Sequence, residues 1–150
     1  MGKMTMMSSC SAPDSRPPQR RRYCLLGFAL GIVAVASAAA QAAPFDLGRA
    51  SFRTNCALCH TVTEGEPHGA GPRLHGVLGR AVASLPDFTY SAALTGIGGH
   101  WDVQRLLMFL AAPAELAPGT AMAFAGLKSE RERRALVCFL SGDAQAEICR

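Results

Sequence analysis

The sequence has few of the patterns that mark other classes of protein. No stretch alternates apolar and polar residues as half-buried strands do, and there is no internal repeat. From Pro44 onward, ten Lys and Arg residues balance ten Asp and Glu residues, which leaves no basic surplus for nucleic acid. A catalytic triad, a phosphate-binding loop and a pair of catalytic carboxylates are also missing. The chain of 150 residues is therefore expected to contain one domain, of the all-α class.

The net charge of +4 comes from the first 43 residues alone. Three arginines at 20–22 precede an apolar run at 25–40, and small residues of the A-x-A type follow. This pattern predicts a cleaved export signal over residues 1–42. The mature domain would then span residues 43–150, with a short C-terminal extension after 142.

Export predicts a periplasmic location. The alternative is an uncleaved helix that anchors the protein to the inner membrane, although the apolar run falls short of the ~20 residues that cross a bilayer. An oxidising compartment also affects the cysteines. Cys10 and Cys24 would leave with the signal. Cys138 and Cys149 remain, either as a disulfide or as one buried and one loose thiol.

The segment Cys56-Ala57-Leu58-Cys59-His60 has the spacing C-x-x-C-H. This spacing is typical of covalent haem attachment, in which two thiols bond the porphyrin and the adjoining imidazole binds iron. A structural zinc site would need further ligands, and no second C-x-x-C or H-x-x-x-H occurs. A thioredoxin-like pair would need a βαβ pattern, which is missing. We expect one haem c bound through Cys56 and Cys59, with His60 on the iron.

Three helices are expected. The first begins near Asp46 as its cap, buries Gly48 and Phe52 against another helix, and ends at the haem motif. The second spans Asp102–Leu110, whose apolar residues recur at helical spacing before Pro113. The third begins at a Ser129–Glu132 capping box and stops near Gly142.

Between the first two helices, residues 61–91 contain glycines and prolines that break any regular pattern. A structureless run of this length argues against a compact domain unless another body fills its centre. A haem is such a body.

Iron held by one imidazole needs a sixth ligand, and Met122 is the candidate. A thioether suits an electron carrier because it favours the ferrous form and raises the potential. The alternative is that Met122 only fills the core. Met108 is the competing methionine, but it lies within the second expected helix.

From Asp46 to Leu140 the chain resembles the class I c-type cytochromes. Phe52 stands four residues before Cys56, as the aromatic of the family's first helix does. The run Gly71–Arg80 matches G-P-x-L-x-G-x-x-G-R, and Pro118–Phe124 repeats the methionine loop. The resemblance implies a small haem-wrapping fold of three to five helices with long loops, in which the N- and C-terminal helices pack together.

The resemblance also implies roles for single residues. The Pro72 carbonyl would accept the proton on the other ring nitrogen of His60. His68 would tie one loop to another. The remaining residues that the resemblance places at the haem are Arg80, Tyr90 and Trp101, near a propionate, and Thr120 in the methionine loop.

This chain departs from the family at several positions. Leu94 replaces a propionate-binding Asn, and Phe109 and Phe139 replace frequent tyrosines, the first of which reaches the ligand sulfur. Lysines that ring the haem edge in mitochondrial relatives are replaced by Asn55, Ala114, Glu115 and Ala121. These replacements predict a largely apolar docking face with weak electrostatic steering.

With His60 and Met122 on both sides of the iron, we expect a one-electron carrier and not an enzyme. Its partners would be redox proteins such as a membrane cytochrome complex, an oxidase or a periplasmic dehydrogenase. A monomer is expected, with membrane contact only if the signal stays uncleaved. Two alternatives remain: a haem subunit of a larger dehydrogenase or oxidase complex, and a peroxidase or small-ligand sensor in which Met122 leaves iron.

Overall fold

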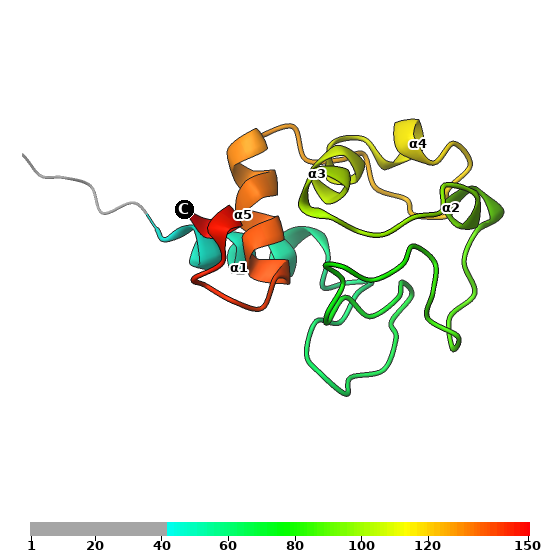
Figure 1. Ribbon diagram of the computed structural model, residues 1–150, viewed down its shortest axis with the longest axis horizontal. Coiled ribbons are helices and arrows are strands. Elements are labelled where there is room, and N and C mark those ends of the chain that lie inside the picture. Colours follow the sequence, from blue (N-terminus) through cyan, green and yellow to red (C-terminus); the bar gives the residue numbers. More distant parts are fainter. Residues whose placement is uncertain (1–41) are drawn as a thin grey trace, which may run out of the picture. The chain divides into compact units, whose positions relative to one another are not determined.

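The computed structural model describes residues 42–150, which contain five α-helices, one 3-10 helix and no strand (Figure 1). The helices are α1 (Pro44–Asn55), α2 (Ala92–Gly96), α3 (Val103–Ala111), α4 (Pro113–Leu116), α5 (Glu130–Leu140) and the 3-10 helix η1 (Glu147–Cys149). A single isolated bridge pairs Ala81 with His100 in this part of the chain. The expected all-α class is confirmed.

The expected export signal lies outside the described residues, apart from Ala42. Within residues 42–150, none of the helices combines the length and the apolar character needed to span a bilayer.

Helix α1 begins earlier than the sequence suggested. Pro44 occupies its first position, where a fixed φ and a missing N–H cost nothing, and Ala43 precedes it without a side-chain cap. The expected cap at Asp46 is therefore wrong. Asp46 lies inside the first turn, 3.7 Å from the Arg49 guanidinium.

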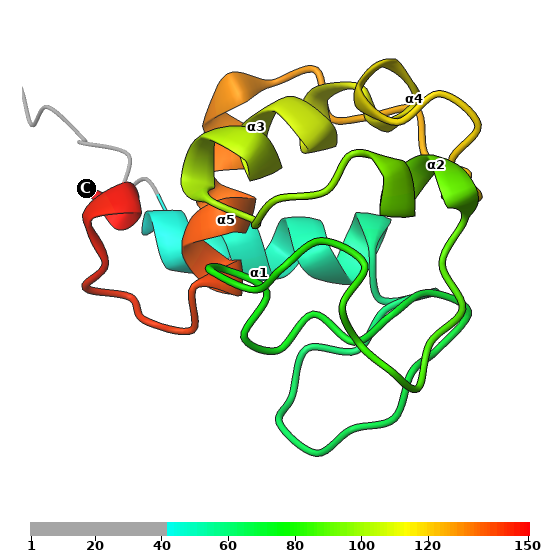
Figure 2. The same cartoon turned by 45° about the vertical axis from the view of Figure 1, so that its right-hand side comes forward.

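Helices α1 and α5 cross and pack directly against each other (Figures 1 and 2). A methyl group at Gly48 would collide with the carbonyl oxygen of Ala135 and lie 2.8 Å from Cβ of Phe139. The Phe139 ring stands 5.4 Å from Phe45 and 5.5 Å from Phe52, measured between centroids. The expected packing of the N- and C-terminal helices is confirmed.

The other two expected helices begin where the sequence placed them, and Ser129 is the expected cap of the second of these. Asp102 Oδ1 accepts the Arg105 N–H at 2.7 Å, and Ser129 Oγ accepts the Glu132 N–H at 3.3 Å. The Glu132 carboxylate does not complete the capping box. It accepts the Ser51 hydroxyl at 2.7 Å instead, and so links α5 to α1.

Residues 61–91 contain no helix, as expected. In both views these loops lie on the side of the domain opposite to α2, α3 and α4 (Figures 1 and 2). Helices α2 and α4 were not anticipated. Ser91 Oγ caps α2 by accepting the Leu94 N–H at 3.3 Å, and Pro113, expected only to end α3, also begins α4.

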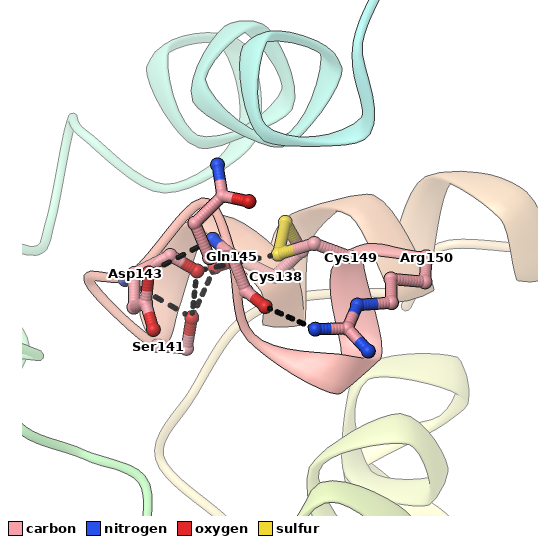
Figure 3. Close-up of a disulfide and its surroundings, with 6 residues drawn as sticks. All are labelled: Cys138, Ser141, Asp143, Gln145, Cys149 and Arg150. Carbon is pink, nitrogen blue, oxygen red and sulfur yellow. Dashed lines mark hydrogen bonds between the residues drawn. A yellow bond between two sulfur atoms is a disulfide. The ribbon is translucent and has the colours of Figure 1, made fainter.

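The C-terminal extension folds back onto α5 through a disulfide between Cys138 and Cys149 (Figure 3). Both cysteines are buried, and their Cα atoms lie 5.0 Å apart. The turn between them is closed locally, since Ser141 Oγ donates to the Cys138 carbonyl at 2.6 Å. Of the two alternatives for this pair, the structure has the disulfide.

Candidate haem-binding site

A single cavity of about 390 Å³ collects every residue that the sequence placed at the haem. These are Cys56, Cys59, His60, Pro72, Arg80, Tyr90, Trp101, Thr120 and Met122. Apolar side chains from α3 and α5 complete the wall; they include Leu106, Phe109, Leu110, Leu136 and Leu140. Its size is within the range of small-molecule sites, roughly 300–1,000 Å³, and its predominantly apolar lining is also typical of them.

The haem motif continues α1 as a tight turn. The Cys56 N–H donates to Phe52 at 2.8 Å, and the Cys56 carbonyl then accepts the N–H groups of Cys59 at 3.0 Å and His60 at 2.8 Å. Cys56 is buried, whereas Cys59 is exposed. Burial, followed by the charges of Cys59 and Glu132, raises the pKa of the Cys56 thiol to about 11. In the folded domain that thiol is therefore protonated at neutral pH.

The His60 ring is oriented by the chain segment that follows it. Its Nδ1 donates to the Pro72 carbonyl at 2.7 Å, and a carbonyl can only accept, so Nδ1 carries the proton and Nε2 keeps its lone pair. Gly71 packs against the His60 ring, and a methyl group at Gly71 would lie 2.8 Å from Nδ1. Burial lowers the pKa of His60, and the bond to Pro72 opposes this only in part. His60 is thus a neutral imidazole, the form that binds a metal.

Three polar side chains line the cavity on its loop side. The Arg80 guanidinium donates to the carbonyls of His75 and Arg73, each at 3.0 Å, and burial lowers its pKa. Tyr90 and Trp101 also line the cavity, and within residues 42–150 neither side chain has a hydrogen-bond partner. A guanidinium, a phenol and an indole N–H suit a group that brings carboxylates into an apolar site.

The two methionines differ sharply in their surroundings. Met122 is half-buried and lines the cavity, and its N–H donates to the Thr120 hydroxyl at 3.3 Å. Met108 is 56% exposed on α3 and takes no part in the cavity wall. Of these two methionines, only Met122 therefore lines the cavity that also contains the haem motif.

The departures from the family fall in two different places. Leu94 and Phe109 line the cavity, and the Phe109 ring stands 5.0 Å from Trp101. Phe139 lies outside the cavity wall and packs between α1 and α5. The first two positions therefore belong to the cavity wall, whereas the third belongs to the helix crossing.

The sequence did not indicate a polar cluster that lies outside the cavity wall and consists of His68, Arg73 and Asp87. His68 accepts the Arg73 N–H at 2.9 Å, and its other ring nitrogen lies 3.0 Å from Asp87. Asp87 also pairs with the Arg73 guanidinium at 2.6 Å. The role of His68 as a tie between loops was expected, but its carboxylate partner was not.

Curated proteins of similar sequence are cytochromes c. The cytochrome c of Stellaria longipes is 44% identical over 89 residues, which are 59% of this chain and 82% of that protein. That of Nigella damascena is 40% identical over 93 residues, 62% of this chain and 84% of that protein. A cytochrome c homolog of Rickettsia bellii is 40% identical over 95 residues, 63% of this chain and 54% of that protein. A comparison with profiles of protein families finds no match.

Proposed function

The chain belongs to the cytochrome c family and is a haem protein that carries electrons and is not an enzyme; we propose that it binds one haem c. The haem would be bonded through Cys56 and Cys59, with iron held between His60 and Met122. The protein would pass single electrons between redox proteins outside the cytoplasm.

One observation carries the proposal: a neutral imidazole and a thioether, sixty-two residues apart in the sequence, line the same largely apolar cavity as two free cysteines. His60 is already oriented by Pro72 at 2.7 Å, with its proton on Nδ1. His60 Nε2 keeps its lone pair and would therefore be the atom that binds the iron.

When bound, a haem would supply one-electron redox chemistry. The chain's own residues would set the conditions for it: Cys56 and Cys59 would anchor the ring, the Met122 sulfur would favour the ferrous form, and the apolar walls would exclude water. Arg80, Tyr90 and Trp101 would hold a propionate, because each offers a donor at the cavity wall.

We further propose that residues 1–42 are removed on export and that the domain of residues 43–150 acts in the periplasm. Its partners would be a membrane cytochrome complex, an oxidase or a periplasmic dehydrogenase. Sequencing the amino terminus of the exported protein tests the boundary. A start near Ala43 is expected, and retention of the apolar run would instead make the protein membrane-anchored.

The ligation is tested by spectroscopy on the purified protein. A pyridine haemochrome typical of haem c, colour that survives acidified acetone and a near-infrared thioether-to-iron band are expected. Met122→Ala should abolish the near-infrared band and allow fast carbon monoxide binding to the ferrous form. Met108→Ala is the matched control and should retain the band. Fast carbon monoxide binding by the unaltered protein would favour a small-ligand sensor, and a colourless protein would refute the proposal.

A further inference from the structure

The peptide group between Pro72 and Arg73 is hydrogen-bonded on both sides. Its carbonyl accepts the proton of His60 Nδ1 at 2.7 Å, and its N–H donates to Nδ1 of His68 at 2.9 Å. A single rigid amide therefore lies between the candidate iron ligand and a second histidine. Whatever polarises the N–H of this amide also polarises its carbonyl.

The second histidine leads on to a carboxylate. Because His68 Nδ1 accepts from Arg73, its proton is on Nε2, and Nε2 donates to Asp87 Oδ1 at 3.0 Å. The Arg73 guanidinium bonds Asp87 Oδ2 at 2.6 Å and approaches His68 Nε2 at 3.3 Å, a contact between two donors. Arg73, and then His68, hold the pKa of Asp87 well below its usual range, so this carboxylate is charged at neutral pH.

We propose that Asp87 is a positioning residue for His60, acting through His68 and the Pro72–Arg73 peptide. The inference rests on the proposed function, since it takes His60 to be the iron ligand. The three hydrogen bonds from His60 to Asp87 all have their donor on the His60 side, and hydrogen bonds that follow one another in this way strengthen each other. The negative charge of the Asp87 carboxylate, at the far end of these hydrogen bonds, makes the Pro72 carbonyl a stronger acceptor and the His60 ring a more basic ligand. A more basic ligand stabilises ferric iron and lowers the reduction potential.

The cluster also has a purely mechanical effect. Asp87 joins the loop of residues 81–90 to the loop of residues 61–75, and the neighbouring Phe88 ring stands 5.1 Å from His68 and 4.9 Å from Tyr90. Losing this tie could move Tyr90 without any electronic effect on His60. The test therefore has to separate the charge of Asp87 from its shape.

Asp87→Asn keeps the shape and an oxygen that can accept from His68, but it removes the charge. We expect a positive shift of the reduction potential and an upfield shift of the His60 Nδ1 proton resonance in the ferrous protein, because the bond to Pro72 weakens. Glu64→Gln is the matched control: it makes the same charge change on an exposed side chain of a neighbouring loop that has no partner within residues 42–150. It should move neither value.

We call the effect of Asp87 on His60, through His68 and the Pro72–Arg73 peptide, the relay. A double-mutant cycle separates this relay from a direct Coulomb effect of the Asp87 charge on the potential, which salt would screen because Asp87 is half-exposed. His68→Asn keeps an acceptor for the Arg73 N–H but removes the ring that reaches Asp87. In this background Asp87→Asn should leave the potential unchanged. An equal shift in both backgrounds would overturn the relay, and so would an unmoved His60 resonance.

The folding of each variant is checked by the near-infrared band and the unfolding midpoint. If Asp87→Asn loosens the loops, Arg73→Gln provides a second test, because it removes the cation that offsets Asp87 and should shift the potential and the resonance in the opposite direction. A potential unaffected by these variants, in a protein that contains haem c and the thioether band, refutes the relay and leaves the proposed function intact. A chain that binds no haem refutes both.

Discussion

Single side chains around the cavity decide how the candidate sulfur ligand is held. Phe109 is buried and lines the same cavity as Met122, and its ring centroid lies 5.0 Å from that of Trp101. No hydroxyl is available from this position to donate to the sulfur. The thioether would therefore keep its full electron density for iron.

Phe109→Tyr should raise the reduction potential and ease the departure of Met122 at alkaline pH. A hydroxyl that donates to the sulfur withdraws density from it, and one such hydrogen bond is worth about 0.5–1.5 kcal/mol. Redox titration and the alkaline loss of the near-infrared band measure the two effects. Phe139→Tyr, which lies outside the cavity wall, serves as the control and should change neither. Unchanged values in Phe109→Tyr would refute the hypothesis.

Site residues that lie close together in the sequence can be identified from the sequence alone. Cys56, Cys59 and His60 lie within one turn, so their convergence follows from helical geometry. The partnership of Asp87 with Arg73 could not be predicted in this way. The two lie fourteen positions apart in irregular loop, and no periodicity relates positions in such a segment.

Among the helices, the crossing of α1 and α5 depends on the missing side chain of Gly48. A methyl group there would collide with the backbone of Ala135, which cannot rotate away as a side chain can. The two helices can approach this closely only because the residue is glycine.

Gly48→Ala should lower the free energy of unfolding by ~1–3 kcal/mol, the usual cost of overpacking. We expect the upper end of this range because the new methyl group would collide with the backbone of Ala135. Gly96→Ala in α2 is the control, since its new methyl group meets open space. That variant should be neutral or more stable by up to about 1 kcal/mol. Guanidinium unfolding followed by circular dichroism compares them, and equal midpoints would contradict this account of the crossing.

The disulfide ties the C-terminal extension to α5 across 11 residues (Figure 3). Closing a loop of this length in the unfolded chain is worth about 3 kcal/mol in the chain-entropy account. Cys149→Ala should lose this stability without reductant, whereas the unaltered protein should lose it only when reductant is added. Thiol counting by mass spectrometry verifies the bond in the unreduced protein. An unfolding midpoint of the unaltered protein that does not change when reductant is added would contradict the prediction.

The longer helices are predictable because α3 has apolar residues at helical spacing over two turns, while a capping box and a glycine stop mark the two ends of α5. Helices α2 and α4 have five and four residues, too few for any periodicity to show. Asp46 is of a residue type that is common at helix caps, but the helix begins two positions before it, at Pro44. Competing start signals within one turn cannot be ranked from sequence alone.

Across the whole domain, the cavity explains why so much irregular chain folds compactly. Residues 61–91 supply Pro72, Arg80 and Tyr90 to the wall of this cavity of about 390 Å³, and most of the rest of the wall is apolar. A haem bound there would therefore pack against these loops and extend the apolar core.

The charge on the surface sets how the domain should meet a redox partner. From Pro44 onward the charges cancel, and Lys128 is the only lysine. The positions that carry lysines in mitochondrial relatives are exposed here and hold Asn55, Ala114, Glu115 and Ala121. Leu58, beside Cys59, is 95% exposed. A neutral, apolar surface steers a charged partner weakly.

The rate of reduction by a physiological partner should therefore change little between low and physiological salt. Electrostatically steered association slows steeply over that range, because screening shortens the reach of surface charge. Stopped-flow kinetics at increasing ionic strength measures the dependence. Asn55→Lys with Ala121→Lys restores two of the missing charges and should create a salt dependence with an acidic partner. A steep decline in the unaltered protein would mean that its docking face is charged after all.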